Sequence, residues 1–200
     1  ESQVLKWPDK LTTDSKYRQK LYKEKLDIDF DYLPSPIDVQ KFSRIGNVKK
    51  IENQVAYVGR DSHEKGIDIL KKAELQINGD VVYCIDRSWE DAMRVIKSSS
   101  VVVVPSRMES LPTVIKEAFY LNVPVVATNV GGIPELVVDN ETGLLVPSEN
   151  PEKIAYSVNE LLSDTEKAKK LSRNGNDFVK KNMIWDVIFP KYIQFYKNLL

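Results

Sequence analysis

Apolar runs of strand length recur through the middle of the chain. They occupy residues 54–59, 80–86, 101–106, 123–129 and 142–147. The third run begins with four consecutive valines. A strand that is covered on both faces by other elements shows such a run, because neither face meets water. The pattern therefore predicts five strands buried inside a layered domain.

Segments of helical period lie between and after these runs. In the first of them, Ile67, Leu70 and either Ala73 or Leu75 are expected to face inward. Ser88 is expected to cap the next, because its hydroxyl can accept a hydrogen bond from a free N–H of the first turn. The predicted helices cover residues 66–75, 88–99, 112–122, 151–163, 165–182 and 184–199. Strands alternating with helices predict an α/β fold, a Rossmann-like doubly wound parallel sheet of about five strands.

Residues 1–42 fall outside this alternation. A charged, helix-like stretch, SKYRQKLYKEKL, precedes LPSPID, whose two prolines force an extended crossing. We therefore divide the chain into a helical connector and hinge at 1–42, a Rossmann-like domain at 43–183 and a C-terminal helix at 184–200. Aromatic residues recur at helical spacing in this last helix and predict a packing stripe.

Composition narrows the classes of function. The 29 basic residues balance the 29 acidic ones, so net charge favours neither nucleic acid nor an anionic membrane surface as a partner. Cys84 lies in the apolar run VVYCI and is expected to be buried as a small hydrophobic residue. No apolar run approaches the roughly 20 residues of a membrane span. The chain begins at Glu1 rather than Met, and we expect it to be a cut piece.

The loops that follow the predicted strands carry the candidate chemistry. In an open parallel sheet, ligands bind beyond the carboxyl ends of the strands, where the strand order reverses. Arg60 and Lys65 share the loop after the first strand and can clamp a diphosphate, arginine as a planar fork and lysine as a point charge. The alternative is a charged surface loop with His63 solvated at its tip. Gly131 and Gly132, after the fourth strand, serve either a close ligand approach or a tight turn.

A helix start follows the third strand. We expect Ser110 to be its N-cap, with Pro112 in the first turn. The free N–H groups of Thr113 and Val114 would then point at the strand edge, where a helix N-terminus favours phosphate.

Two glutamates frame this helix start. Glu109 stands just before the helix and would face the group beyond the phosphates. Glu117 shares a helix face with Thr113 and can accept hydrogen bonds from ribose hydroxyls. The alternative for Glu117 is a role in helix-dipole or salt-bridge stabilisation. An Asp-x-Asp sequence at 27–31 lies in the connector, away from this edge, and we expect no metal site there.

These motifs together resemble a known family. The stretch 101–155, with seven residues between Glu109 and Glu117 and PVVAT after them, closely resembles the C-terminal donor-binding domain of retaining glycosyltransferases of family 4 (group 1), which have the GT-B fold. Upstream, GRDSHEKG resembles the family's Gly-Arg…Lys-Gly loop, and LPSPIDVQKF its connector. The likeness covers about 33–200.

The resemblance implies roles for single residues. Arg60, Lys65 and Glu109 would be catalytic: the two cations would stabilise charge on the leaving nucleoside diphosphate, and Glu109 would contact the transferred sugar. Glu117 would bind the ribose. The residues expected to contact the donor are Gly59, Arg60, Lys65, Arg87, Glu109, Leu111, Pro112, Thr113, Val114 and Glu117. The implied donor is a UDP- or GDP-linked sugar, transferred with retention to an acceptor hydroxyl without a metal or other cofactor.

The sequence departs from the family pattern at two places. One strand-helix unit of the family is lacking before VVVVPS. Its absence changes the expected walls of the pocket for the nucleotide base, near Arg87. The acceptor domain is absent apart from residues 1 to about 32, which resemble its final helix, so the chain should bind a donor without completing transfer. Residues 184–200 resemble the terminal helix that crosses back to that domain, with partly uncovered aromatic residues.

The partners and the location follow from the same resemblance. We expect a glycan or lipid acceptor bound through the missing domain, no nucleic acid and no transmembrane segment. The expected location is cytoplasmic, with peripheral contact at the inner face of the membrane. Two other functions remain open: a non-catalytic nucleotide-sugar binding module, and a phosphorylase or epimerase on the same fold.

Overall fold

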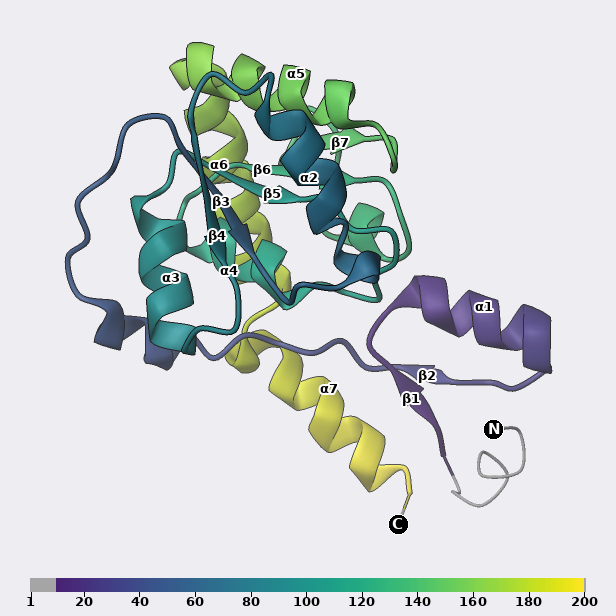
Figure 1. Cartoon of the computed structure of the whole chain (residues 1–200). Coiled ribbons are helices and arrows are strands. Elements are labelled where there is room, and N and C mark those ends of the chain that lie inside the picture. Colours follow the sequence, from purple (N-terminus) through teal and green to yellow (C-terminus); the bar gives the residue numbers. More distant parts are fainter. Residues whose placement is uncertain (1–9, 200) are drawn as a thin grey trace.

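The computed structural model describes residues 10–199 (Figure 1). Its strands are β1 Thr12–Thr13, β2 Asp31–Tyr32, β3 Gln54–Val58, β4 Asp80–Cys84, β5 Val101–Val104, β6 Val125–Thr128 and β7 Leu144–Val146. Its α-helices are α1 Lys16–Leu26, α2 Ile67–Glu74, α3 Trp89–Ser98, α4 Thr113–Tyr120, α5 Pro151–Ser163, α6 Thr165–Asn182 and α7 Trp185–Lys197. Three 3₁₀ segments are η2 Val39–Ile45, η3 His63–Lys65 and η4 Ile133–Glu135.

The main sheet has five strands in the order β4-β3-β5-β6-β7, and every neighbouring pair is parallel. All five strands fall within the predicted runs, so the predicted parallel sheet is confirmed. The chain leaves β3 for β4 on one side and then returns to β5 on the other. The strand order therefore reverses at β3, which places the crevice for a ligand between the carboxyl ends of β3 and β5.

Helices cover both faces of this sheet. Val101 and Val103 of β5 belong to a core cluster with residues of α2 and α5. Val102 and Val104 belong to a second cluster with residues of α3, α4 and α6. Successive side chains of a strand point to opposite faces, so the run of valines fills both cores at once. This arrangement confirms the doubly wound prediction.

Of the two residues expected to complete the inner face of α2, Ala73 does so: α2 ends at Glu74, Leu75 is 89% exposed, and Ile69 is buried together with Ile67, Leu70 and Ala73. The expected start of α4 was wrong. Ser110 is not the N-cap of α4, because the cap position is taken by Pro112, whose φ of −62° and ψ of 121° are extended. The predicted cap of α3 is confirmed, since the Ser88 hydroxyl accepts the N–H of Asp91.

The N-terminal segment forms a small unit beside the domain (Figure 1). Strands β1 and β2 pair in parallel, and α1 connects them. The chain then crosses in extended form to Ile37, whose N–H donates to the carbonyl of Met183 at 2.9 Å. The predicted helical connector is present among residues 10–42. The boundaries at 42 and 183 remain predictions, and residues 1–9 lie outside the described part.

One buried lysine fastens this crossing to the domain. Lys116 of α4 is fully buried, and its ammonium donates to the carbonyl and to the hydroxyl of Ser35 at 2.7 and 3.0 Å. Burial lowers the pKa of Lys116 to about 8, although the charges of Asp14 and Glu117 act to raise it.

Helix α7 carries the aromatic stripe that the sequence predicts, but it is only partly packed. Ile188 is fully buried, whereas Trp185 is 41% and Tyr196 is 58% exposed. Tyr192 contacts the ring of Trp185 at a centroid distance of 5.6 Å. None of the helices within residues 10–199 combines the length and the apolar character needed to cross a bilayer.

Candidate functional site

A cavity of about 480 Å³ lies at the reversal of strand order. It collects residues from the loop after β3, from the segment between β5 and α4, and from the N-terminal unit. The lining residues are Asp14, Arg18, Val58, Gly59, Arg60, Lys65, Glu109, Ser110, Leu111, Pro112, Thr113 and Val114. Eight of the ten predicted donor contacts therefore line one cleft.

The loop that carries Arg60 and Lys65 is held by an arginine that the sequence analysis did not single out. Arg107 donates from Nη1 and Nη2 to the two oxygens of Asp68 at 2.7 and 2.8 Å, and from Nη1 to the carbonyl of His63 at 2.7 Å. Its guanidinium also pairs with Glu149. This bidentate contact lowers the pKa of Asp68 to about 2. The cleft loop is thereby tied to α2 and to the segment after β5.

Lys65 and Glu109 form an ion pair inside the cleft. Lys65 Nζ lies 2.7 Å from Glu109 Oε1, and the side chain of Glu109 is only 9% exposed. The Ser106 hydroxyl donates to the same oxygen at 2.8 Å. Arg60 is exposed and makes no ion pair with any residue of the described part. Arg18 is likewise exposed and makes no ion pair within residues 10–199, so the cleft presents one fixed cation, Lys65, and two that are free to meet an anion.

The N-terminus of α4 opens into the same cleft. Pro112 caps this helix without a side-chain hydrogen bond, and the backbone N–H groups of Thr113 and Val114 have no acceptor within residues 10–199. These groups and the helix dipole favour an anion at this position. Ser110 points instead to the N-terminal unit: its hydroxyl donates to Asp14 and lies 3.1 Å from the Ser15 hydroxyl.

The two glycines after β6 pack against the chain itself. A Cβ atom built on Gly131 would lie 1.9 Å from the carbonyl oxygen of Glu109, and one built on Gly132 would lie 1.8 Å from that of Ser110. Gly131 also has a φ of +55°. The pair therefore lies in a turn that packs closely against the segment before α4, and the close approach of a ligand stays a prediction. The glycines let the two loops stack and fix the position of Glu109.

Glu117 and Arg87 are outside the residues that line the cleft. Glu117 is 9% exposed, and its Oε1 accepts the indole N–H of Trp89 at 2.7 Å. Burial raises the pKa of Glu117, while the bond from Trp89 acts to lower it. Arg87 is exposed in the loop between β4 and α3. Asp14 and Arg18 do line the cleft. They lie 40 or more positions before Val58, the next lining residue along the chain, and no local sequence pattern marks them as part of the site.

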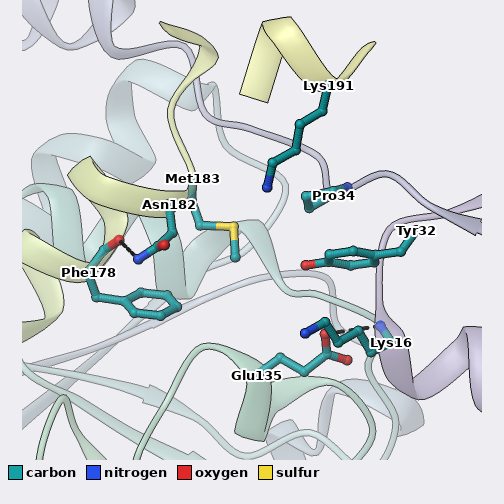
Figure 2. A pocket seen from close by; sticks show the side chains of 8 residues that line it. All are labelled: Lys16, Tyr32, Pro34, Glu135, Phe178, Asn182, Met183 and Lys191. Carbon is teal, nitrogen blue, oxygen red and sulfur yellow. Dashed lines mark hydrogen bonds between the residues drawn. The ribbon is translucent and has the colours of Figure 1, made fainter. Parts of the chain in front are cut away.

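A second cavity of about 300 Å³ separates the N-terminal unit from the end of α6 (Figure 2). Its walls come from the N-terminal segment, η4, α6 and α7. The lining side chains are Lys16, Tyr32, Pro34, Glu135, Phe178, Asn182, Met183 and Lys191. On its floor, Glu135 accepts the backbone N–H groups of Lys16 and Tyr17 at 3.0 and 2.8 Å. A carboxylate of the domain thus caps the N-terminus of α1.

Replacing Glu135 by alanine should loosen the N-terminal unit. Two N–H groups lose their acceptor, which costs about 1 kcal/mol for a helix cap. We expect amide hydrogen exchange at residues 12–32 to become roughly fivefold faster, with little change in the main sheet. Glu141→Ala removes an exposed glutamate outside this contact and serves as the control. Equal exchange in the Glu135 variant and the wild type would show that other contacts hold the unit.

Two solved structures share the fold. Sucrose-phosphate synthase from Thermosynechococcus elongatus matches with a TM-score of 0.86 and 23% identity, over 99% of this chain and 60% of that one. The Anabaena protein Alr3699/HepE, solved in complex with UDP-glucose, matches with a TM-score of 0.81 and 17% identity, over 94% of this chain and 64% of that one. The chain therefore has the α/β architecture of part of a GT-B glycosyltransferase.

One curated relative is a GDP-mannose-dependent alpha-(1-6)-phosphatidylinositol monomannoside mannosyltransferase of Mycobacterium tuberculosis. It is 37% identical over 91 residues, which are 46% of this chain and 24% of that protein. The chain spans less than half the length of the curated relatives that it matches.

The family model of the glycosyl transferases group 1 matches residues 71–178. The match includes Glu109, Glu117 and the whole of α4, and it begins after Arg60 and Lys65. It covers more than half of the 200 residues. The chain therefore belongs to the group 1 glycosyl transferases.

Proposed function

We propose that this chain is the donor-binding part of a retaining glycosyltransferase. The diphosphate of a nucleotide sugar binds between Arg60, Lys65 and the N-terminus of α4. Glu109 accepts hydrogen bonds from hydroxyls of the transferred sugar, and Glu117 binds the ribose. The acceptor hydroxyl is presented by a further part of a longer protein, and the glycosidic bond forms as the nucleoside diphosphate leaves.

One observation carries the proposal. Three cations, Arg18, Arg60 and Lys65, and the unsatisfied N–H groups of α4 line the same cleft at the reversal of strand order, and the carboxylate of Glu109 lies among them. Positive groups fixed before the reaction stabilise the charge that develops on a leaving diphosphate. They supply that charge from the protein itself, so the transfer we propose requires no metal ion.

The geometry explains how a carboxylate can sit beside a bound diphosphate. Glu109 is already neutralised by Lys65 and accepts the Ser106 hydroxyl, both at Oε1. Its Oε2 has no partner among residues 10–199 and can accept a sugar hydroxyl. The ion pair therefore allows the carboxylate of Glu109 to lie close to the diphosphate, because Lys65 contacts both.

The comparisons name two different bases for the donor nucleotide. The mycobacterial relative is named for GDP-mannose, whereas the Anabaena neighbour is bound to UDP-glucose. A panel of both bases is therefore the first experiment. A ligand that binds only the native state raises its melting temperature, so thermal shifts rank the panel directly.

Arg60→Ala tests the diphosphate contact. Against the nucleoside diphosphate that gives the largest shift, we expect calorimetric affinity to fall about tenfold, since a charge-assisted contact is worth roughly 1.5–3 kcal/mol and Arg60 is exposed. Arg94→Ala, an exposed arginine of α3 outside the cleft, should bind as the wild type does. A wild-type chain that binds no member of the panel would contradict the proposed function.

A further inference from the structure

The N-terminal unit contributes two charged side chains to the cleft. Asp14 lies two residues before helix α1, and Arg18 lies in the first turn of that helix. Both residues line the same cavity as Arg60 and Lys65. The match to the family model begins at residue 71 and includes neither of them. One wall of the cleft therefore comes from a part of the chain that the family model does not describe.

A chain of hydrogen bonds fixes this wall against the segment before α4. The Ser110 hydroxyl donates to Asp14 and lies 3.1 Å from the hydroxyl of Ser15, which is fully buried. The Ser15 oxygen accepts the backbone N–H of Arg18 at 3.2 Å. Ser110 directly follows Glu109, so both charged residues of the N-terminal unit meet the cleft at the end where the transferred sugar is proposed to bind.

The charged groups of Asp14 and Arg18 are available to a ligand. The two residues are four positions apart at the start of a helix, yet they form no ion pair with each other or with any other residue of 10–199. Within the same residues the guanidinium of Arg18 has no hydrogen-bond acceptor, and the carboxylate of Asp14 accepts only the Ser110 hydroxyl. A guanidinium only donates hydrogen bonds and a carboxylate only accepts them, so this wall offers both kinds of group.

The position of Arg18 does not favour the helix itself. The first turn of α1 contains Lys16 and Arg18 and no acidic residue. A cation at this end of a helix opposes the helix dipole. The helix is held in place by Glu135, which accepts the N–H groups of Lys16 and Tyr17. Residues that break a local rule are expected where binding offsets the cost, so the placement of Arg18 supports a role in binding.

We propose that Asp14 and Arg18 bind hydroxyl groups of the transferred sugar. The inference rests on the proposed function, and it adds the N-terminal unit to the donor site. A diphosphate only accepts hydrogen bonds, so it has nothing to donate to Asp14, whose charge also repels it. A sugar hydroxyl both donates and accepts, so Asp14 can accept its hydrogen bond while Arg18 donates to a neighbouring oxygen. The pair therefore distinguishes a sugar conjugate from the bare nucleoside diphosphate.

Arg18→Gln tests the arginine. Titration calorimetry compares UDP with UDP-glucose and GDP with GDP-mannose, for whichever base the wild type binds. We expect the variant to bind the sugar conjugate about fivefold more weakly, because a charge-assisted hydrogen bond is lost, and the bare diphosphate within about twofold of the wild type. An equal loss for both ligands would make Arg18 a diphosphate contact and overturn the inference.

Asp14→Asn gives a sharper signature, because it removes a negative charge from the cleft. The bare diphosphate should bind equally or up to about twofold more tightly, whereas the sugar conjugate should bind about fivefold more weakly. A general loss of folding would weaken both ligands and cannot produce this divergence.

Matched controls come from α6, where an exposed arginine and an exposed aspartate are also four positions apart. Arg173→Gln and Asp177→Asn lie outside the cleft and should bind both ligands as the wild type does. If Asp14→Asn changes the affinity for both ligands by the same factor, the N-terminal unit does not contact the sugar and the inference is overturned. A wild type that binds neither the diphosphates nor their conjugates would contradict the proposed function itself.

Discussion

Lys65→Met should weaken binding of the nucleoside diphosphate about 100-fold. The variant loses a charge-assisted contact to the diphosphate, worth roughly 1.5–3 kcal/mol. It also leaves Glu109 without its cation, since Lys65 Nζ lies 2.7 Å from Glu109 Oε1 in the wild type. The uncompensated carboxylate then repels the ligand. For this reason the loss should exceed that of Arg60→Ala, and isothermal titration calorimetry measures both.

The double variant Lys65→Met/Glu109→Gln separates these two effects. If repulsion from Glu109 contributes, the added substitution should restore part of the affinity, about tenfold. Lys72→Met, an exposed lysine of α2 outside the cleft, controls for the loss of one positive charge. An unchanged affinity in Lys65→Met would place the diphosphate elsewhere.

The second large effect is a rise in stability with pH that depends on Lys116. The pKa of its ammonium is about 8 in the folded chain, against the ordinary lysine value of 10.5. The folded state therefore binds fewer protons than the unfolded state between these values, and the free energy of unfolding increases as the pH rises through this window. From pH 7 to pH 9.5 the expected gain is about 2 kcal/mol.

Urea unfolding of the wild type and of Lys116→Met at these two pH values measures the gain. The variant should lack the part of the rise that Lys116 causes, so the comparison cancels the smaller contribution of Lys50, whose pKa is also lowered by burial. The raised pKa of Tyr57, about 12, acts in the opposite direction but only above the ordinary tyrosine pKa near 10. If the free energy of unfolding changed equally with pH in the two proteins, the pKa of Lys116 would be the same in the folded and the unfolded chain.

The sheet was predictable because its signal is local. Four consecutive valines can satisfy two apolar faces only as a buried strand, and β5 is such a strand. The start of α4 was less predictable. Ser110 has the chemistry of an N-cap, but Leu111 precedes Pro112, and a residue before proline is pushed out of the helical region. The helix therefore begins only after Pro112, and the hydroxyl of Ser110 meets Asp14 instead.

The sequence predicted the charged residues that line the candidate site, but it did not predict the residues that hold them in place. Arg60, Lys65 and Glu109 follow strands directly, so the sheet topology alone brings them together. Arg107 and Trp89 act through partners 28 or more positions away, and no periodic pattern encodes such pairs. Whether Arg87 contacts the base remains a prediction.

The reactivity of the single thiol measures how often the edge of the sheet opens. Cys84 is 5% exposed and ends the edge strand β4, and its carbonyl accepts the N–H of Gly59 at the start of the cleft loop. A thiol reagent can reach it only when this edge detaches, so the labelling rate counts local openings of the native state. A ligand that orders the cleft loop should slow that rate, so labelling of Cys84 would report whether the cleft is occupied.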